Sequence, residues 1–176
     1  MNFPILSSLI LLPIIGSIFL IFIKSEKDNN PIKYVALFIS LANLFLGLYL
    51  WFIFDSSTSD FQFVENRNWI LGLINYKVGI DGISILFVIL ATLITPLCIL
   101  SVNSTIKYRL KDFLISILIM ESLMIGVFCS LDLVVFYLFF EGGLIPMFLI
   151  IGIWGGERRV YSAFKFFLYT LLGSVL

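Results

Sequence analysis

Two glutamates stand in the middle of long apolar stretches of this sequence. Glu121 lies eight residues into the apolar run 113–130, and Glu141 lies eight residues after Leu133, where the next run begins. An ionised side chain at the centre of a membrane helix costs about 2.5–3.5 kcal/mol, and a surrounding of low dielectric constant favours the protonated carboxyl. A carboxyl in such a place takes up or releases a proton as its neighbours change, so the pattern predicts a proton relay. The alternative is a protonated glutamate that only bonds a neighbouring helix.

One lysine accompanies them. Lys165 lies inside the last apolar run of the chain. Two interpretations are open: Lys165 tunes the two glutamates or relays protons with them, or its ammonium extends to the nearby membrane surface while its methylene groups stay in the apolar region.

The backbone beside Glu141 favours a functional role. Gly142 and Gly143 follow it directly, and Pro146 lacks the N–H that would bond the carbonyl of Gly142. An unpaired carbonyl at membrane depth is tolerated only where protein or water covers it. The sequence therefore predicts a hydrated pocket at Glu141.

The elements that carry these residues are membrane helices. The chain of 176 residues is 61% hydrophobic and 12% charged, with no net charge and a mean hydropathy of +1.13, whereas soluble domains are about 45–50% apolar and about 25% charged. These values exclude a disordered chain, a nucleic-acid-binding domain and an ordinary soluble enzyme. A helix needs about 20 apolar residues to cross a bilayer. We expect an all-α integral membrane protein, a polytopic helical bundle with five complete transmembrane helices and the start of a sixth, at 3–23, 34–54, 82–102, 113–130, 133–153 and 161–176.

The fourth and fifth helices are joined by a turn of only three residues, 130–132. In a tight antiparallel hairpin, Glu121 and Glu141, each nine residues from this turn, therefore come to about the same depth, near the middle of the membrane. Two acidic residues, Asp81 and Asp132, stand at helix starts, where a carboxylate is favoured by the helix dipole.

The charges of the loops predict the orientation. The connections after the first, third and fifth helices hold eight basic residues, which are Lys24, Lys27, Lys33, Lys107, Arg109, Lys111, Arg158 and Arg159. The long connection 55–81 holds only Arg67 and Lys77, and the fourth holds none. By the positive-inside rule the N-terminus lies outside. The mixed aromatic and charged residues of 55–81 form either a short interfacial hairpin or an amphipathic turn.

The sequence holds no histidine and two cysteines, Cys98 and Cys129, each inside an apolar run. Metal and iron–sulfur sites need clustered ligands, so we expect no metal or redox centre in this chain and two buried thiols.

Several motifs resemble one family. They are Val78-Gly-Ile-Asp-Gly-Ile-Ser84, Met120-Glu-Ser-Leu-Met-Ile-Gly-Val-Phe128, the stretch from Leu133 through Phe-Phe-Glu141-Gly-Gly-Leu-Ile-Pro146 to Gly156, and the continuation from Arg158 to Ser174. This stretch, from about residue 76 to the end, resembles chain M (subunit 4) of the proton-pumping NADH:quinone oxidoreductase, respiratory complex I, in the antiporter-like family of membrane subunits. The first 75 residues resemble it weakly.

The resemblance implies a fold of about fourteen helices, of which this chain would be an N-terminal fragment. Residues 1–130 would hold helices one to four with the outside loop 55–81, and residues 131–176 would begin the proton-translocating domain. It implies that Glu141 is the proton-channel glutamate of the fifth helix, which in the family pairs with a lysine on the seventh helix. The acidic position of Glu121 occurs in part of the family, and Phe140 stands where the family often has Trp.

The resemblance also implies partners and place. NADH, FMN, iron–sulfur clusters and quinone would belong to other subunits of the complex. The membrane partners would be the neighbouring antiporter-like chains of the L and N types, in a bacterial or mitochondrial inner membrane. Two alternatives stay open: a subunit of a multi-subunit cation/proton antiporter, which shares the fold and the glutamate, and a passive membrane anchor without an ion path.

Overall fold

The computed structural model describes residues 4–23, 30–70, 74–106 and 108–176. Within these residues the chain forms six helices and one two-stranded hairpin. In chain order they are α1 (Ile5–Phe22), α2 (Asn30–Ile53), β1 (Gln62–Ile70), β2 (Ile74–Ile80), α3 (Ser84–Thr105), α4 (Leu110–Cys129), α5 (Leu133–Trp154) and α6 (Arg159–Val175). The helical membrane fold predicted from the sequence is confirmed, and α1 to α5 are each long and apolar enough to cross a membrane.

The largest difference from the predicted bounds is at the start of α2, which begins at Asn30 rather than at residue 34. Apolarity marks only the membrane-buried part of a helix, whereas the helix itself extends through a polar first turn. Pro31 suits that turn, because its fixed φ and missing N–H cost nothing at a helix start. The helices also run without a break through Pro13, Pro96 and Pro146, so each proline removes one hydrogen bond and does not divide its helix.

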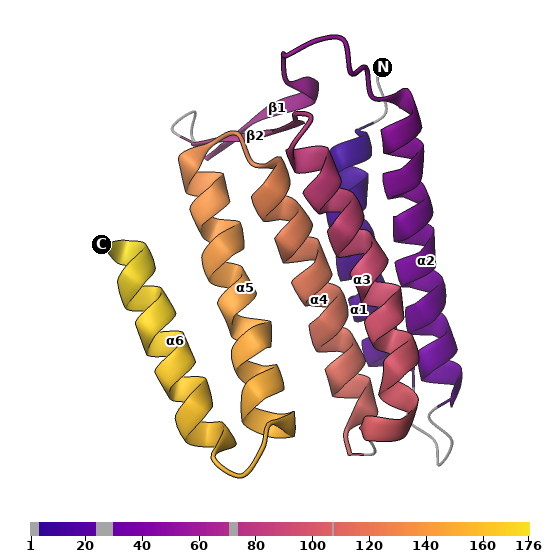
Figure 1. The fold of residues 1–176 in the computed structure, drawn as a ribbon, viewed down its shortest axis with the longest axis vertical. Coiled ribbons are helices and arrows are strands. Elements are labelled where there is room, and N and C mark those ends of the chain that lie inside the picture. Colours follow the sequence, from indigo (N-terminus) through magenta and orange to yellow (C-terminus); the bar gives the residue numbers. More distant parts are fainter. Residues whose placement is uncertain (1–3, 24–29, 71–73, 107) are drawn as a thin grey trace.

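The first four helices form a bundle, and α5 and α6 continue from it as a row, with α5 on α4 and α6 on α5 (Figure 1). Two groups of buried apolar side chains hold the bundle together. One lies near the hairpin and includes Leu6, Leu50 and Ile125; the other lies toward the opposite end and includes Leu20, Ile99 and Leu118. All four helices contribute to both groups, and α4 is the central one because it contacts α1, α2, α3 and α5.

The long connection between α2 and α3 folds as an antiparallel β-hairpin, which confirms the first of the two alternatives for it. The hairpin lies at the same end as the start of α1 and the α4–α5 turn (Figure 1). It is fastened there because Val78 and Ile80 are fully buried and the Leu131 N–H of the turn donates to the Lys77 carbonyl at 2.9 Å. It is the one non-helical element in the described part of the chain.

Acidic side chains bind the starts of α1, α3 and α5 at this end. Asp81 accepts from the backbone N–H groups of Ile83 and Ser84, and Asp132 accepts from those of Val134 and Val135. Both confirm the predicted helix-end carboxylates. The start of α1 is bound by Glu65 of β1, which the sequence did not indicate.

Basic side chains bind helix ends at the opposite side of the molecule. The Lys111 ammonium donates to the carbonyls of Ile21 and Ile23 at 2.8 and 2.7 Å, just where α1 ends, and the Arg159 guanidinium donates to the Ile153 carbonyl of α5 at 2.7 Å. Cations are favoured at helix C-termini. The predicted basic residues Lys24, Lys27 and Lys107 lie outside the described residues. Those that are described share one end, as the positive-inside assignment requires.

Candidate functional site

Glu141 lies between α5 and α6. It is eight residues from the Leu133 start of α5 and half-buried, and its Oε1 accepts a hydrogen bond from the hydroxyl of Ser174 on α6. The two helices are held together by edge contacts of Phe148 with Phe164 and Phe167, at ring-centroid distances of 5.3 and 5.6 Å. The contact between α5 and α6 therefore sets which polar group meets the Glu141 carboxyl.

The glycines after Glu141 have different surroundings. A Cβ at Gly142 would lie 3.3 Å from the Leu123 side chain of α4, so this glycine allows α5 to approach α4. A Cβ at Gly143 would meet nothing within 4 Å. One side of α5 near Glu141 is thus packed on α4, and another has open space. This space is compatible with the hydrated pocket predicted at Glu141, which stays a prediction.

Glu121 lies inside the four-helix bundle. Its side chain is 3% exposed, and its Oε1 accepts a hydrogen bond of 2.9 Å from the Asn43 amide of α2. The next residue, Ser122, is fully buried and donates to the Ile10 carbonyl of α1. Helix α4 therefore makes polar contacts with two neighbouring helices at the level of Glu121.

The two glutamates have equivalent positions along the α4–α5 hairpin but different partners. Glu121 is eight residues before the end of α4 at Cys129, and Glu141 is eight residues after the start of α5. The hydrogen bond of Glu121 leads to α2, whereas that of Glu141 leads to α6. The sequence correctly placed both along their helices; it did not indicate that their partners lie on different helices.

Lys165 lies on the exposed side of α6. Its ammonium is 5.9 Å from the Tyr161 ring centre and 6.0 Å from that of Tyr169, a favourable distance for cation–π contacts. Among the residues that the structure describes, the only ion pair joins Arg109 and Asp112. A role of Lys165 toward a glutamate stays a prediction.

Two partners of the glutamates escaped the sequence reading, although each left a signal. Asn43 is a carboxamide inside the apolar run 34–54, and a buried amide needs a hydrogen-bonding partner. Ser174 is a hydroxyl inside the last apolar run. Each residue indicates a polar contact with another helix. Its position in the sequence does not identify that helix.

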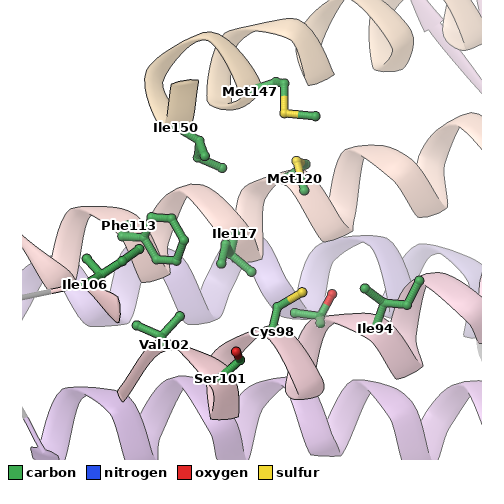
Figure 2. A pocket seen from close by; sticks show the side chains of 11 residues that line it. Ile94, Cys98, Ser101, Val102, Ile106, Phe113, Ile117, Met120, Met147 and Ile150 are labelled. Atoms are coloured by element: carbon green, nitrogen blue, oxygen red, sulfur yellow. The ribbon is translucent and has the colours of Figure 1, made fainter. Parts of the chain in front are cut away.

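The hollow between α3, α4 and α5 is not part of this site. It has a volume of about 370 Å³, and Figure 2 shows Met120, Met147, Ile117 and Cys98 around it. The residues that line it include no acidic or basic side chain. Cys98 is exposed here, so the prediction of two buried thiols is right for Cys129 and wrong for Cys98. In an apolar membrane helix a small residue can face outward as readily as inward, and composition does not distinguish the two.

No group of three or more His, Cys, Asp or Glu side chains that could hold a metal ion occurs in the described ranges.

Comparisons with known proteins agree on one family. A family model described as NADH:quinone oxidoreductase/Mrp antiporter, TM, matches residues 130–176. NADH-quinone oxidoreductase subunit M of Rhodobacter capsulatus is 58% identical over 85% of this chain and 28% of the relative. NADH-ubiquinone oxidoreductase chain 4 of Arabidopsis thaliana is 51% identical over 97% of this chain and 34% of the relative.

A solved structure shares the fold. A chain of the membrane-bound sulfane sulfur reductase, an archaeal respiratory membrane complex, superimposes with a TM-score of 0.78 at 19% identity, over 97% of this chain and 26% of that one. The chain spans about a third of the length of the curated relatives it matches. Over the residues that align, the chain belongs to the family of NADH-quinone oxidoreductase subunit M and NADH-ubiquinone oxidoreductase chain 4.

Proposed function

We propose that this chain is part of a proton-translocating membrane subunit of an NADH:quinone oxidoreductase, an enzyme complex that couples electron transfer from NADH to quinone to proton pumping. The observation that carries the proposal is the identity of 44–58% with proteins named subunit M or chain 4. The family model's description also covers an antiporter, but these relatives favour the oxidoreductase. By the same argument the membrane is a bacterial or mitochondrial inner membrane.

Within this proposal Glu141 is the proton-channel carboxyl. Its place in the middle of α5, its half-buried state and the hydroxyl of Ser174 beside it support the assignment. The Ser174 hydroxyl can both donate to and accept from the Glu141 carboxyl, so it can hold either the ionised or the protonated form. Residues 131–176 then begin the proton-translocating domain, and residues 1–130 hold the four helices and the hairpin that support it.

Two further residues have secondary roles in the proposal. Glu121 is a second carboxyl able to hold a proton. Lys165 tunes Glu141 at a distance: it lies on α6, the helix that carries the Glu141 partner Ser174, about 13 Å along the helix from Ser174.

The cofactors of the proposed complex are NADH, FMN, iron–sulfur clusters and quinone, all carried by other subunits. The partners are other membrane subunits, among them neighbouring antiporter-like chains of the L and N types.

The test is Glu141→Gln in the intact complex. The glutamine keeps the size and the acceptor oxygen but cannot release a proton, so we expect strongly reduced proton pumping and quinone-coupled NADH oxidation. Glu157→Gln, at an exposed position between α5 and α6, is the matched control and should leave both unchanged. The amount of assembled complex is measured in each strain. Full pumping by an assembled Glu141→Gln complex would refute the assignment.

A further inference from the structure

Asn43 and Glu121 form a polar contact sealed inside the bundle. Asn43 is fully buried and Glu121 is 3% exposed. The Asn43 Nδ2 donates to Glu121 Oε1 at 2.9 Å, which joins α2 to α4. The described helices by themselves bury this contact, so its geometry does not depend on any further part of the protein.

Each of the two groups also has one oxygen without a hydrogen-bond partner. These atoms are Asn43 Oδ1 and Glu121 Oε2, both buried. An amide oxygen and an ionised carboxylate oxygen can only accept hydrogen bonds. With Glu121 ionised, the contact would leave two buried acceptors and a buried negative charge, an arrangement that folded proteins rarely tolerate. In the described part of the chain the only ion pair is Arg109–Asp112, so no basic side chain there pairs with such a charge.

One proton resolves both deficits. A proton on Glu121 Oε2 makes this oxygen an O–H donor. The Asn43 Oδ1 is an acceptor that has no donor. The amide then donates to the carboxyl through Nδ2 and accepts from it through Oδ1, so the two planar groups form two hydrogen bonds in opposite directions. Glu121 Oε2 and Asn43 Oδ1 have no hydrogen-bond partner when Glu121 is ionised, but they are a donor and an acceptor when Glu121 is neutral.

We propose that Glu121 and Asn43 form a proton-binding site inside the α1–α4 bundle, in which the neutral Glu121 carboxyl donates its proton to the Asn43 carbonyl. Asn43 is a positioning residue here, since it holds the carboxyl in its protonated form. The proton leaves only when the amide turns away or α2 moves relative to α4. The inference goes beyond the proposed function and does not depend on it, because the site is defined by burial and hydrogen bonding and not by pumping.

The test is infrared spectroscopy on the full-length protein in membranes. A protonated carboxyl has a C=O stretching band that an ionised carboxylate lacks and that shifts in D₂O. We expect Glu121→Gln to remove one such band. The glutamine should be accepted by the fold, because its NH₂ group replaces the O–H as donor to Asn43. Asn43→Leu should keep the band and move it to higher frequency, since the strong acceptor is gone; Asn43→Ser serves where the leucine variant does not accumulate.

Two control variants make the result specific. Ser40→Ala changes another fully buried residue of α2, whose hydroxyl bonds the Leu37 carbonyl of its own helix, and should leave the band in place. Glu141→Gln should leave it in place too, because Glu141 bonds Ser174. Loss of carboxylate absorption instead of a C=O band in Glu121→Gln would overturn the proposal. A C=O band whose frequency is unchanged in both Asn43 variants would refute the role of Asn43. Neither result depends on whether the Glu141 variant pumps protons.

Discussion

Glu65 connects the hairpin to the first membrane helix. Its Oε1 accepts from the backbone N–H groups of Leu6 and Ser7 at 3.0 and 3.3 Å, and its Oε2 accepts from the Ser7 hydroxyl. These two amides belong to the first turn of α1, where N–H groups have no partner within the helix. Residues 4 and 5, Pro4 and Ile5, offer no capping side chain. Glu65, almost sixty residues later in the chain, thus takes the place of the missing N-cap.

The expected energy follows from these bonds. Loss of a capping side chain costs about 1 kcal/mol, within a range of about 0.5–2, and loss of a negative charge at a helix start costs about 0.3–1 kcal/mol. For Glu65→Ala, which removes both, we expect about 2 kcal/mol, or about a 30-fold larger opening constant for the first turn of α1. For Glu65→Gln, which retains an acceptor oxygen but no charge, we expect about 1 kcal/mol, or about fivefold.

Hydrogen exchange of the full-length protein in lipid nanodiscs measures this directly. Under conditions in which local reclosing is faster than chemical exchange, the exchange rates of the Leu6 and Ser7 amides report the opening constant. Asp60→Ala, at an exposed acidic residue of the same connection, is the control and should leave these rates unchanged. The first turn of α5, which Asp132 caps, should also stay unchanged in Glu65→Ala. Unaltered rates at Leu6 and Ser7, or an equal increase in α5, would show that Glu65 does not cap α1.

Two other predictions concern packing and pH. A Cβ at Gly126 would lie within 2.7 Å of three ring atoms of Phe139, so Gly126→Ala should lower the stability of the α4–α5 pair by about 1–3 kcal/mol. A Cβ at Gly143 would lie in open space, so Gly143→Ala should leave this stability unchanged or raise it by up to about 1 kcal/mol. Thermal unfolding compares the two variants. The Ser84 N–H lowers the pKa of Asp81 below 3.8, so the ionised carboxylate stabilises the start of α3 above about pH 4 and this contribution is lost as the pH falls through the lowered pKa. In Asp81→Asn, the backbone amides of the first turn of α3 should therefore exchange hydrogen faster near neutral pH than in the unsubstituted chain. Their protection from exchange should also fall less between about pH 5 and about pH 3. Equal acid sensitivity of the two proteins would contradict this prediction.

The features that the sequence predicts well are those that depend on residues close together in the chain. An apolar run must be long enough to cross a bilayer, and this length requirement places five spans and the depth of each glutamate. The caps of α3 and α5 are also local, because Asp81 and Asp132 stand directly before the turns they bind. The cap of α1 is not local. Glu65 reaches Leu6 only after the hairpin has folded onto the bundle, and no spacing rule connects the two positions.

The direction in which a side chain points is the part that the sequence could not give. Successive residues of a helix are rotated by about 100°, and three successive residues of α4 illustrate the consequence. Met120 borders the hollow between α3, α4 and α5 (Figure 2). Glu121 bonds α2, and Ser122 bonds α1. A helix with one apolar face would have revealed its orientation through its period. Helix α4 has no single apolar face, so its rotation is fixed by its contacts with α1, α2, α3 and α5.

This distinction changes what the matched depth of the two glutamates means. Equal depth follows from the short α4–α5 turn alone, because any two residues eight positions from the adjoining helix ends, Cys129 and Leu133, would share the same depth. Proton transfer requires instead a chain of hydrogen-bonding groups, and the bonds of Glu121 and Glu141 lead to opposite sides of the α4–α5 pair, to Asn43 and Ser174. Equal depth therefore does not indicate a shared proton path. The arrangement favours two separate polar contacts over one chain of groups, a buried one between α4 and α2 at Glu121 and a half-buried one between α5 and α6 at Glu141.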